Sequence, residues 1–433
     1  MATIQELARL VRELEDQLVV CMRCGMCQAV CPLYGETGRE ADVARGKLAL
    51  LEGLSREMFR DPAGVSERLH RCLLCGSCAA NCPSGVKVLD IFLKARAILA
   101  GYQGLSPVKK AVLRGMLGNP EIFDRVMEWG ARFQKIFTRP ANETLGTSCA
   151  RFGASLLGNR HIKPLAPKPF HAELPSLDEA PGASGVKAAF FVGCLIDKIF
   201  PSVARASLKV LRHHGVGVYL PDNQACCGIP AASSGDLETF KKLVRHNLER
   251  FPVDRFDVLI TSCATCTATI RKVWPVLFQE EGPEVLERVQ ALSEKAMDIH
   301  AFLVGRLGVA PDPVPPEKDA LAVTYHDPCH LRKSLGVFAE PRRLLQASPS
   351  VRLVEMAQPD WCCGLGGSFS LEHYDLSAGI GRRKRDQVAA AGCRVVTTGC
   401  PACMIQLHDQ LSQAGDTVTV RHAIEIYAEN LNS

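Results

Sequence analysis

The residues with the clearest chemistry are eight cysteines arranged in two copies of one spacing. Both copies follow the pattern C-x2-C-x2-C-x3-C-P, first at Cys21, Cys24, Cys27 and Cys31, then at Cys72, Cys75, Cys78 and Cys82. Three thiolates two residues apart can wrap a loop around three irons of a cube, and the fourth cysteine usually reaches the other cluster. The spacing therefore predicts two [4Fe–4S] clusters, one on Cys21, Cys24, Cys27 and Cys82, the other on Cys72, Cys75, Cys78 and Cys31.

Zinc is the alternative metal for these cysteines, because C-x2-C pairs also hold zinc ions. A zinc site needs four ligands in two pairs and has no use for the repeated third cysteine or the Cys-Pro ending. The pattern therefore favours clusters, whose chemistry is electron transfer. Arg23, Arg45 and Lys47 fall close to these loops, where they either stabilise anionic clusters or remain solvated charges.

The second half of the chain repeats a pattern of five cysteines. The first copy contains Cys194, Cys226, Cys227, Cys263 and Cys266, and the second contains Cys329, Cys362, Cys363, Cys400 and Cys403. Corresponding cysteines lie 135 to 137 residues apart, a register that chance does not keep over this length. Each group falls where a predicted strand ends, and open α/β sheets build their sites at those ends.

The composition favours a reduced metalloprotein over a secreted, disulfide-bonded one. The chain has 433 residues, 20 cysteines and a mild net charge of +5, which fits an acidic partner or an anionic membrane but by itself indicates neither. The first residues lack the apolar region of a signal peptide, and no run of about 18 apolar residues predicts a transmembrane helix. We expect a cytoplasmic protein that meets the inner face of the membrane only peripherally, through partners.

The motifs divide the chain into four predicted segments. Residues 1–138 form an α-helical domain with the cluster loops, 139–186 a Pro-rich linker, and 187–310 and 318–433 two α/β repeats with parallel strands. One helix is predicted over 284–307. The apolar residues between 101 and 140 are predicted to be ordinary core, with a docking or quinone-adjacent surface as the alternative. The basic run 381–385 is predicted to be a solvated face, with a docking site for an acidic partner as the alternative. Cys149 and Cys393 fall outside the repeat and are not expected to be ligands.

The order of Cys, Cys-Cys-Gly and Cys-x-x-Cys resembles the cysteine-rich CCG domain of heterodisulfide reductase catalytic subunits and of 2-hydroxy-acid dehydrogenase iron–sulfur subunits. With the paired ferredoxin-type loops, the chain resembles the iron–sulfur subunit of glycolate oxidase and its D-lactate relatives over essentially its whole length. His326-Asp-Pro-Cys329-His330 resembles the loop that opens the second CCG repeat in that family. The resemblance implies an α-helical ferredoxin domain followed by two repeated α/β CCG domains.

The resemblance also has consequences for the metal sites. Complete five-cysteine sets in heterodisulfide reductases hold non-cubane [4Fe–4S] clusters, so each set here is expected to hold such a cluster or, alternatively, a structural zinc ion. His326 and His330 are then either hydrogen-bond donors to cluster sulfurs or ordinary loop histidines. Glycolate oxidase subunits often lack part of these sets, and their completeness here gives some weight to the disulfide reductase branch.

A site for an organic hydride acceptor is not evident in the sequence. No G-x-G-x-x-G follows a predicted strand, and the glycine-rich stretch after Cys363 belongs to the cysteine pattern. Iron–sulfur clusters carry single electrons, so a flavin on another chain must split the electron pair of the substrate.

We therefore expect an electron-transfer subunit with no catalytic residue of its own. Its FAD-containing partner oxidises glycolate or D-lactate, and the electrons leave to quinone or another carrier; no nucleic acid is expected as a partner. Disulfide cleavage at non-cubane CCG clusters is the alternative function, and a zinc-holding scaffold is a third. The sequence does not decide the hydroxy acid, the final acceptor, the order of electron flow or the subunit stoichiometry.

Overall fold

The computed structural model describes residues 4–432 except residues 60, 152–157 and 311, and it divides into two compact units. The first unit comprises residues 1–118, 228–242 and 364–380. The second comprises residues 119–227, 243–363 and 381–433. Short segments that follow each Cys-Cys pair thus belong to the first unit, and the four segment bounds predicted from the sequence stay a prediction.

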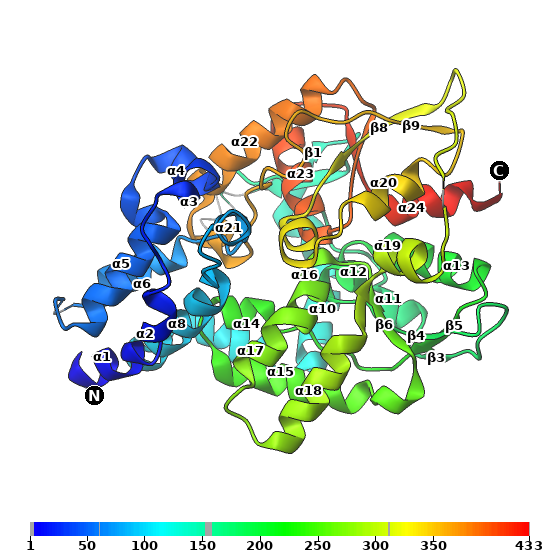
Figure 1. Cartoon of the computed structure of the whole chain (residues 1–433). Helices are drawn as coiled ribbons and strands as arrows, with labels where there is room; N and C mark the ends of the chain where they lie inside the picture. Colours follow the sequence, from blue (N-terminus) through cyan, green and yellow to red (C-terminus); the bar gives the residue numbers. More distant parts are fainter. Residues whose placement is uncertain (1–3, 60, 152–157, 311, 433) are drawn as a thin grey trace. The chain divides into compact units, whose positions relative to one another are not determined.

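The described part of residues 4–118 contains helices and no strand (Figure 1). Apolar residues at helical spacing explain this, since α1 buries Leu7, Ala8 and Val11 on one face. The helices of the first unit up to residue 118 are α1 (Ile4–Arg12), α2 (Glu15–Leu18), α3 (Met26–Ala29), α4 (Pro32–Thr37), η1 (Glu40–Asp42), α5 (Ala44–Ser55), α6 (Ala63–His70), α7 (Ser77–Ala80), α8 (Val88–Gln103), α9 (Pro107–Lys110) and η2 (Ala111–Leu117). The unit also contains α14 (Ile229–Ser233), α21 (Ser368–Glu372) and the first turns of α15 (Leu237–Arg250) and α22 (Tyr374–Ala390).

The first repeat is built on a five-stranded sheet in the second unit. Its strands lie in the order β3 (Leu177–Asp178), β5 (Gly217–Leu220), β4 (Lys187–Phe191), β6 (Val258–Thr261) and β7 (Ala296–Asp298). All neighbours are parallel except β3, which pairs antiparallel with β5 at the edge. The inner strands are buried runs, as in β6, where every residue is buried, and this is typical of parallel sheets covered on both faces.

The second repeat has the same strand order on a four-stranded parallel sheet. The order is β11 (Thr419–His422), β10 (Val395–Thr398), β8 (Leu321–His326) and β9 (Val351–Leu353). Strands β8, β9, β10 and β11 therefore correspond to β4, β5, β6 and β7. In each repeat the first cysteine and the Cys-x-x-Cys pair follow directly after neighbouring strands, so the predicted α/β repeats and the placement of their cysteines at strand ends are present.

Helices of the second unit flank these sheets. They are α10 (Pro120–Phe137), α11 (Phe170–Glu173), α12 (Cys194–Lys198), α13 (Pro201–His213), η3 (Val253–Arg255), α16 (Ala264–Ala268), η4 (Thr269–Val273), α17 (Trp274–Leu277), α18 (Pro283–Lys295), α19 (Ile299–Ala301), η5 (Phe302–Arg306), η6 (His330–Ser334), α20 (Ala339–Leu345), α23 (Pro401–Gln413), α24 (Ala423–Glu429) and η7 (Asn430–Asn432). The remaining parts of α15 and α22 also belong to this unit. Among the described residues, every helix is too short or too polar to span a bilayer.

Two sequence expectations about elements are wrong. The single helix predicted over 284–307 is interrupted, because Ala296–Asp298 pair with β6 as strand β7 and Asp298 caps the next helix by accepting hydrogen bonds from backbone N–H groups. The apolar residues of α10 are not core, since none is buried and Trp129 is 62% exposed. Part of the predicted linker is also ordered, with β1 (Thr138–Asn142) paired antiparallel to β2 (Thr147–Ala150).

Candidate metal centres

The two cluster loops of the first unit share one backbone path. Arg23 and Gly25 in the first loop have φ values of 58° and 88°, and Leu74 and Gly76 in the second have 54° and 75°. Left-handed conformations at matching positions coil the chain so that successive cysteines can face one centre. The loops thus have the same shape although Arg23 and Leu74 differ in chemistry.

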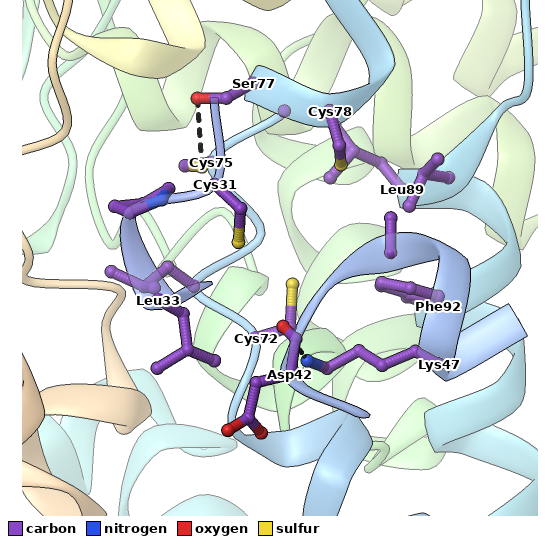
Figure 2. Close-up of a pocket in the computed structure, with 15 residues that line it drawn as sticks. Cys31, Leu33, Asp42, Lys47, Cys72, Cys75, Ser77, Cys78, Leu89 and Phe92 are labelled. Atoms are coloured by element: carbon purple, nitrogen blue, oxygen red, sulfur yellow. Dashed lines mark hydrogen bonds between the residues drawn. The ribbon is translucent and has the colours of Figure 1, made fainter. Parts of the chain in front are cut away.

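Four cysteines from both motifs line one pocket. Cys31, from the first motif, lies in its wall with Cys72, Cys75 and Cys78 from the second. Figure 2 shows the sulfur atoms of Cys31 and Cys72 turned toward the same space. Burial, with the nearby Cys75 and Cys72, raises the pKa of Cys31 to about 12, so a metal must displace its proton on binding. Four soft sulfur donors around one pocket fit a [4Fe–4S] cluster.

Two buried cations support this pocket. Lys47 is 1% exposed, and burial lowers its pKa although the thiolate of Cys72 favours its charged form. Arg96 is 2% exposed, and its guanidinium donates hydrogen bonds to the backbone carbonyls of Leu69 (2.6 Å), Cys72 (2.7 Å) and Ser233 (2.7 Å). The sequence placed Lys47 beside the loops but missed Arg96, whose only signal is a basic residue on an apolar helix.

The other predicted ligand set consists of Cys21, Cys24, Cys27 and Cys82, and among these four described residues an interaction relates only Cys21 and Cys27. Burial raises the pKa of Cys27, Cys21 raises it as well, and the charge of Arg45 opposes both. Arg45 donates a hydrogen bond of 3.1 Å to the carbonyl of Arg23 inside the loop, so this cation supports the first loop. Cys24 is exposed, and the assignment of Cys82 to this set rests on spacing alone.

In the first repeat the five cysteines gather at the strand ends. The Sγ atoms of Cys194 and Cys226 lie 3.9 Å apart, and a side-chain hydrogen bond joins Cys227 to Cys266. A Cβ on Gly193 would lie 3.0 Å from the sulfur of Cys266, which explains a glycine with a φ of 78° beside Cys194. Except for the half-buried Cys194 these cysteines are buried.

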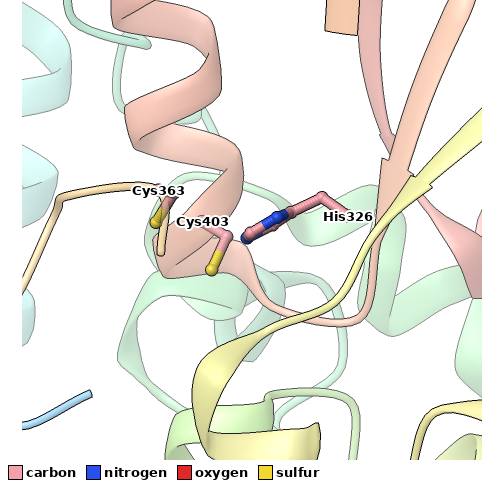
Figure 3. A group of neighbouring side chains, drawn as sticks. All are labelled: His326, Cys363 and Cys403. Carbon is pink, nitrogen blue, oxygen red and sulfur yellow. The ribbon is translucent and has the colours of Figure 1, made fainter. Parts of the chain in front are cut away.

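In the second repeat a histidine joins the cysteines. One ring nitrogen of His326 and the sulfur atoms of Cys363 and Cys403 lie within 4.8 Å of one another, and all three residues are buried (Figure 3). Hydrogen bonds with Cys362 and Cys403, together with His326, lower the pKa of Cys363 well below its usual value, against the effect of burial. Cys329 and Cys400 are also buried. Nitrogen and thiolate donors at this separation can hold iron or zinc.

The two Cys-x-x-Cys turns meet inside the second unit. A side-chain hydrogen bond joins Cys263 to Cys400, and the N–H of Ala264 donates to the carbonyl of Gly399 over 3.1 Å. His330 lies 3.1 Å from the hydroxyl of Thr265 in the first repeat, so this predicted site residue bridges the repeats. The two five-cysteine sets are therefore neighbours at their Cys-x-x-Cys turns.

Only part of the basic run 381–385 is the solvated face that the sequence predicted, since Arg382 and Arg383 are exposed and Lys384 is buried. Lys384 is 0% exposed, and burial lowers its pKa to about 8, opposed by the charges of Cys329 and Cys363. Arg385 pairs with Asp416 at 2.5 Å. Lys384 on α22 therefore lies in the interior, and its interaction with the charges of the cysteine set is the observation that links it to the metal site.

A further group of possible ligands, Asp124, His171 and Asp197, is better explained by ion pairing. The ammonium of Lys198 lies 2.6 Å from Asp124 and 2.5 Å from Asp197, which fills the position of a cation. Cys149 in β2 and the buried Cys393 join none of the cysteine groups described above.

Comparison with known proteins agrees with this arrangement. The model of the cysteine-rich CCG domain matches residues 188–271 and 323–408, and that of the 4Fe-4S dicluster domain matches residues 17–86. The molecule is thus an iron–sulfur protein with a ferredoxin-like N-terminal domain and two CCG repeats, and it carries [4Fe–4S] clusters. The residue-by-residue ligand assignment stays a prediction.

Three relatives show which iron–sulfur proteins this chain is similar to. The chain is 29% identical to the probable glycolate oxidase iron-sulfur subunit of Bacillus subtilis, over 97% of this chain and 96% of the relative. It is 32% identical to lactate utilization protein A of an Exiguobacterium species, over 56% of this chain and 97% of the relative. Identity to a dihydromethanophenazine:CoB–CoM heterodisulfide reductase component of Methanosarcina barkeri is 26%, over 96% and 94%. The chain belongs to the glycolate oxidase and lactate utilization family of oxidoreductase iron–sulfur subunits.

Proposed function

We propose that this chain is the electron-transfer subunit of a flavin-dependent 2-hydroxy-acid dehydrogenase. A partner flavoprotein oxidises glycolate or D-lactate to the 2-oxo acid, and the two electrons released enter this chain singly. The observation that carries the proposal is the series of sulfur-lined sites, since a chain of this kind needs one-electron centres and [4Fe–4S] clusters supply them when bound. Quinone or another carrier is the proposed final acceptor.

The protein's own residues have three tasks in this function. The cysteine thiolates hold the centres, and Lys47, Arg45 and Arg96 balance negative charge or fix the loops that present them. Buried aromatic residues such as Trp274, which donates a hydrogen bond of 2.9 Å to the carbonyl of Cys227, exclude water from the cysteine turns.

The glycine-rich segment after Cys363 supports the assignment of the flavin to a partner. A Cβ on Gly366 would meet Phe369 at 3.0 Å and Leu73 at 3.2 Å, so this glycine is required by packing inside the first unit. The segment therefore contributes to packing in the fold, which is a different role from that of a glycine-rich loop that binds the pyrophosphate of a dinucleotide.

Anaerobic EPR with iron quantitation tests the proposal. The purified chain is measured before and after addition of its co-purifying flavoprotein and D-lactate or glycolate. Signals of reduced [4Fe–4S] clusters that appear only with flavoprotein and hydroxy acid together are the expected result. Clusters that stay oxidised under these conditions but are reduced by dithionite would exclude the dehydrogenase role.

Disulfide reduction is the second candidate, favoured by the completeness and the contact of the two five-cysteine sets. It moves the chemistry into this chain, because a bound disulfide would accept two electrons and two protons to give two thiols. Consumption of reduced viologen on adding a disulfide, with thiol release measured in parallel, would support this function. About sixteen irons per chain, rather than about eight, are required for it, at four per cluster.

A further inference from the structure

The two CCG repeats have the same topology but different side chains beside their cysteines. Strand β6 pairs Thr261 with Phe191, and strand β10 pairs Thr398 with His326, with each threonine two residues before a Cys-x-x-Cys cysteine. His326 in the second repeat therefore occupies the position of Phe191 in the first. The correspondence is fixed by sheet register, independently of any alignment of sequences.

The two repeats also differ in side-chain charge at a second pair of corresponding buried positions. Asn247 on α15 and Lys384 on α22 each lie sixteen residues before the first cysteine of the Cys-x-x-Cys pair. Both are 0% exposed. The neutral amide of Asn247 is used within the fold, since it donates to the carbonyl of Cys226 (3.1 Å) and accepts from the N–H of Ala225 (3.0 Å). The second repeat has a cation where the first has a neutral, satisfied side chain.

The side chain of Lys384 is surrounded by hydrogen-bond acceptors. Its Nζ donates to the carbonyl of Gln358, to Oε1 of Gln387 at 2.9 Å and to the sulfur of Met356 at 3.6 Å, all of which are acceptors. The charges of Cys329 and Cys363 act on the same ammonium. The carboxylate of Asp360 also acts on this ammonium, whereas Asp327 in the opening loop is neutralised by Arg332 and Arg342 at 2.6 and 2.7 Å.

The imidazole of His326 is the other polar group aimed at the second site. It is 0% exposed, and neither ring nitrogen makes a hydrogen bond of ordinary geometry to the described residues, although the ring interacts with the thiol of Cys363. A buried polar group left unsatisfied costs about 1–3 kcal/mol, so a metal centre beside Cys363 and Cys403 is the natural partner for this ring. Phe191 instead packs against Phe251, with ring centroids 5.6 Å apart, and offers no donor.

We propose that His326 and Lys384 raise the reduction potential of the centre in the second CCG repeat above that of the centre in the first. A positive charge and a nitrogen donor both favour the reduced, more negative state of an iron–sulfur centre. Transfer of one electron from the first centre to the second then oxidises the first centre and reduces the second, and no bond breaks. The inference rests on the proposed electron-transfer function and gives it a direction that the sequence left open.

An EPR-monitored redox titration of the full chain tests this direction. The expected result is two CCG centres whose reduction equilibria differ at least tenfold, which is 59 mV for a one-electron couple. His326→Phe and Lys384→Met should lower only the higher potential, each by about tenfold in the equilibrium. Phe191→His should raise only the lower potential, because it gives the first repeat the donor of the second.

Matched controls separate tuning from general damage. His408→Phe removes another buried histidine with an unpartnered nitrogen, and Lys295→Met removes another ammonium held by two backbone carbonyls. Neither control should shift either CCG potential. Equal potentials in the native chain, or control shifts as large as those of the test variants, would overturn the inference.

Two further outcomes keep the inference distinct from the proposed function. If His326→Phe loses iron, Lys384→Met and Phe191→His still decide the direction. About eight irons per chain, with cluster reduction by hydroxy acid intact, would overturn the inference and leave the proposed function standing.

Discussion

At the scale of single residues, buried cations hold the cysteine loops in place. Arg96 extends from α8 to three carbonyls, including that of Cys72, the first cysteine of the second cluster motif. Carbonyls without a partner are costly when buried, whereas each N–H of a guanidinium can satisfy one of them. The guanidinium therefore fixes where the second loop begins.

Replacing Arg96 should destabilise the first unit. Arg96→Met leaves the carbonyls of Cys72 and Ser233 without a donor, whereas that of Leu69 still accepts from the N–H of Cys72 at 3.1 Å. At about 1–3 kcal/mol for each of the two, the expected loss is about 2 kcal/mol or more. Arg96→Lys should recover part of this, because an ammonium can still reach one or two of the carbonyls. Chemical denaturation followed by circular dichroism measures the change. A loss below about 1 kcal/mol in Arg96→Met would show that water replaces the guanidinium.

Cys31 tests whether the fourth cysteine of one motif serves the other cluster. It lies in the pocket of Cys72, Cys75 and Cys78, so Cys31→Ser and Cys72→Ser should each remove about four irons. The double variant should also lose about four, because both residues serve one cluster. If each motif instead held its own cluster, the double variant would lose about eight. Cys149→Ser, on β2, serves as the control with unchanged iron content.

At the scale of elements, the helix α10 carries its apolar residues on an exposed face. Ile122, Val126, Trp129 and Ile136 follow helical spacing, and each is more than 40% exposed. Sequence periodicity predicts such a stripe but cannot tell whether another element covers it. The expectation of ordinary core failed for this reason.

Tryptophan substitutions can distinguish an exposed apolar face on α10 from one that is covered by another element. Trp129→Ser should leave the melting temperature nearly unchanged, because its side chain is largely exposed. Trp274→Ser should cost about 3–5 kcal/mol, since that ring is 0% exposed and donates to the carbonyl of Cys227. Calorimetry on both variants gives the comparison. Equal destabilisation would mean that α10 is buried in solution.

Much of the architecture could be predicted from the sequence, and the failures have physical causes. The cysteine spacing and the 135–137-residue register predicted the cluster loops, both repeats and the strand ends that hold the cysteines. Strand β7 was missed because three residues are too few for a periodic signal, and its pairing with β6 is a long-range interaction. Lys384 was predicted to be solvated because charge alone does not predict burial. In the structure, the charges of the neighbouring cysteines partly offset the effect of burial on its pKa.

At the scale of the whole molecule, the two repeats of the second unit depend on one another. His422 in the second repeat lies 2.9 Å from the carbonyl of Ser262 in the first, and its ring stacks on His300 at 5.5 Å. Segments before the first repeat reach the second as well, since the hydroxyl of Thr147 hydrogen-bonds that of Ser412 on α23. Local protonation in α23 should therefore affect the stability of the unit as a whole.

His408 on α23 makes this dependence testable through pH. Burial, with the charge of Lys163 as a smaller cause, lowers the pKa of His408 to about 3, whereas an unfolded histidine has a pKa of about 6.5. Below pH 6.5 the unfolded chain binds a proton that the folded chain does not. Stability is therefore fully present above pH 6.5 and falls by about 1.4 kcal/mol per pH unit below it.

The variant His408→Leu should lack this contribution. Between pH 7.5 and 5.5 the native chain should lose about 1.4 kcal/mol more of its unfolding free energy than the variant. Anaerobic urea denaturation at both pH values measures the difference, and iron content at each pH shows that the clusters are retained. Parallel pH profiles would mean that His408 is protonated in the folded chain. A steeper profile in the native chain would show that one buried imidazole on α23 sets part of the acid sensitivity of the whole second unit.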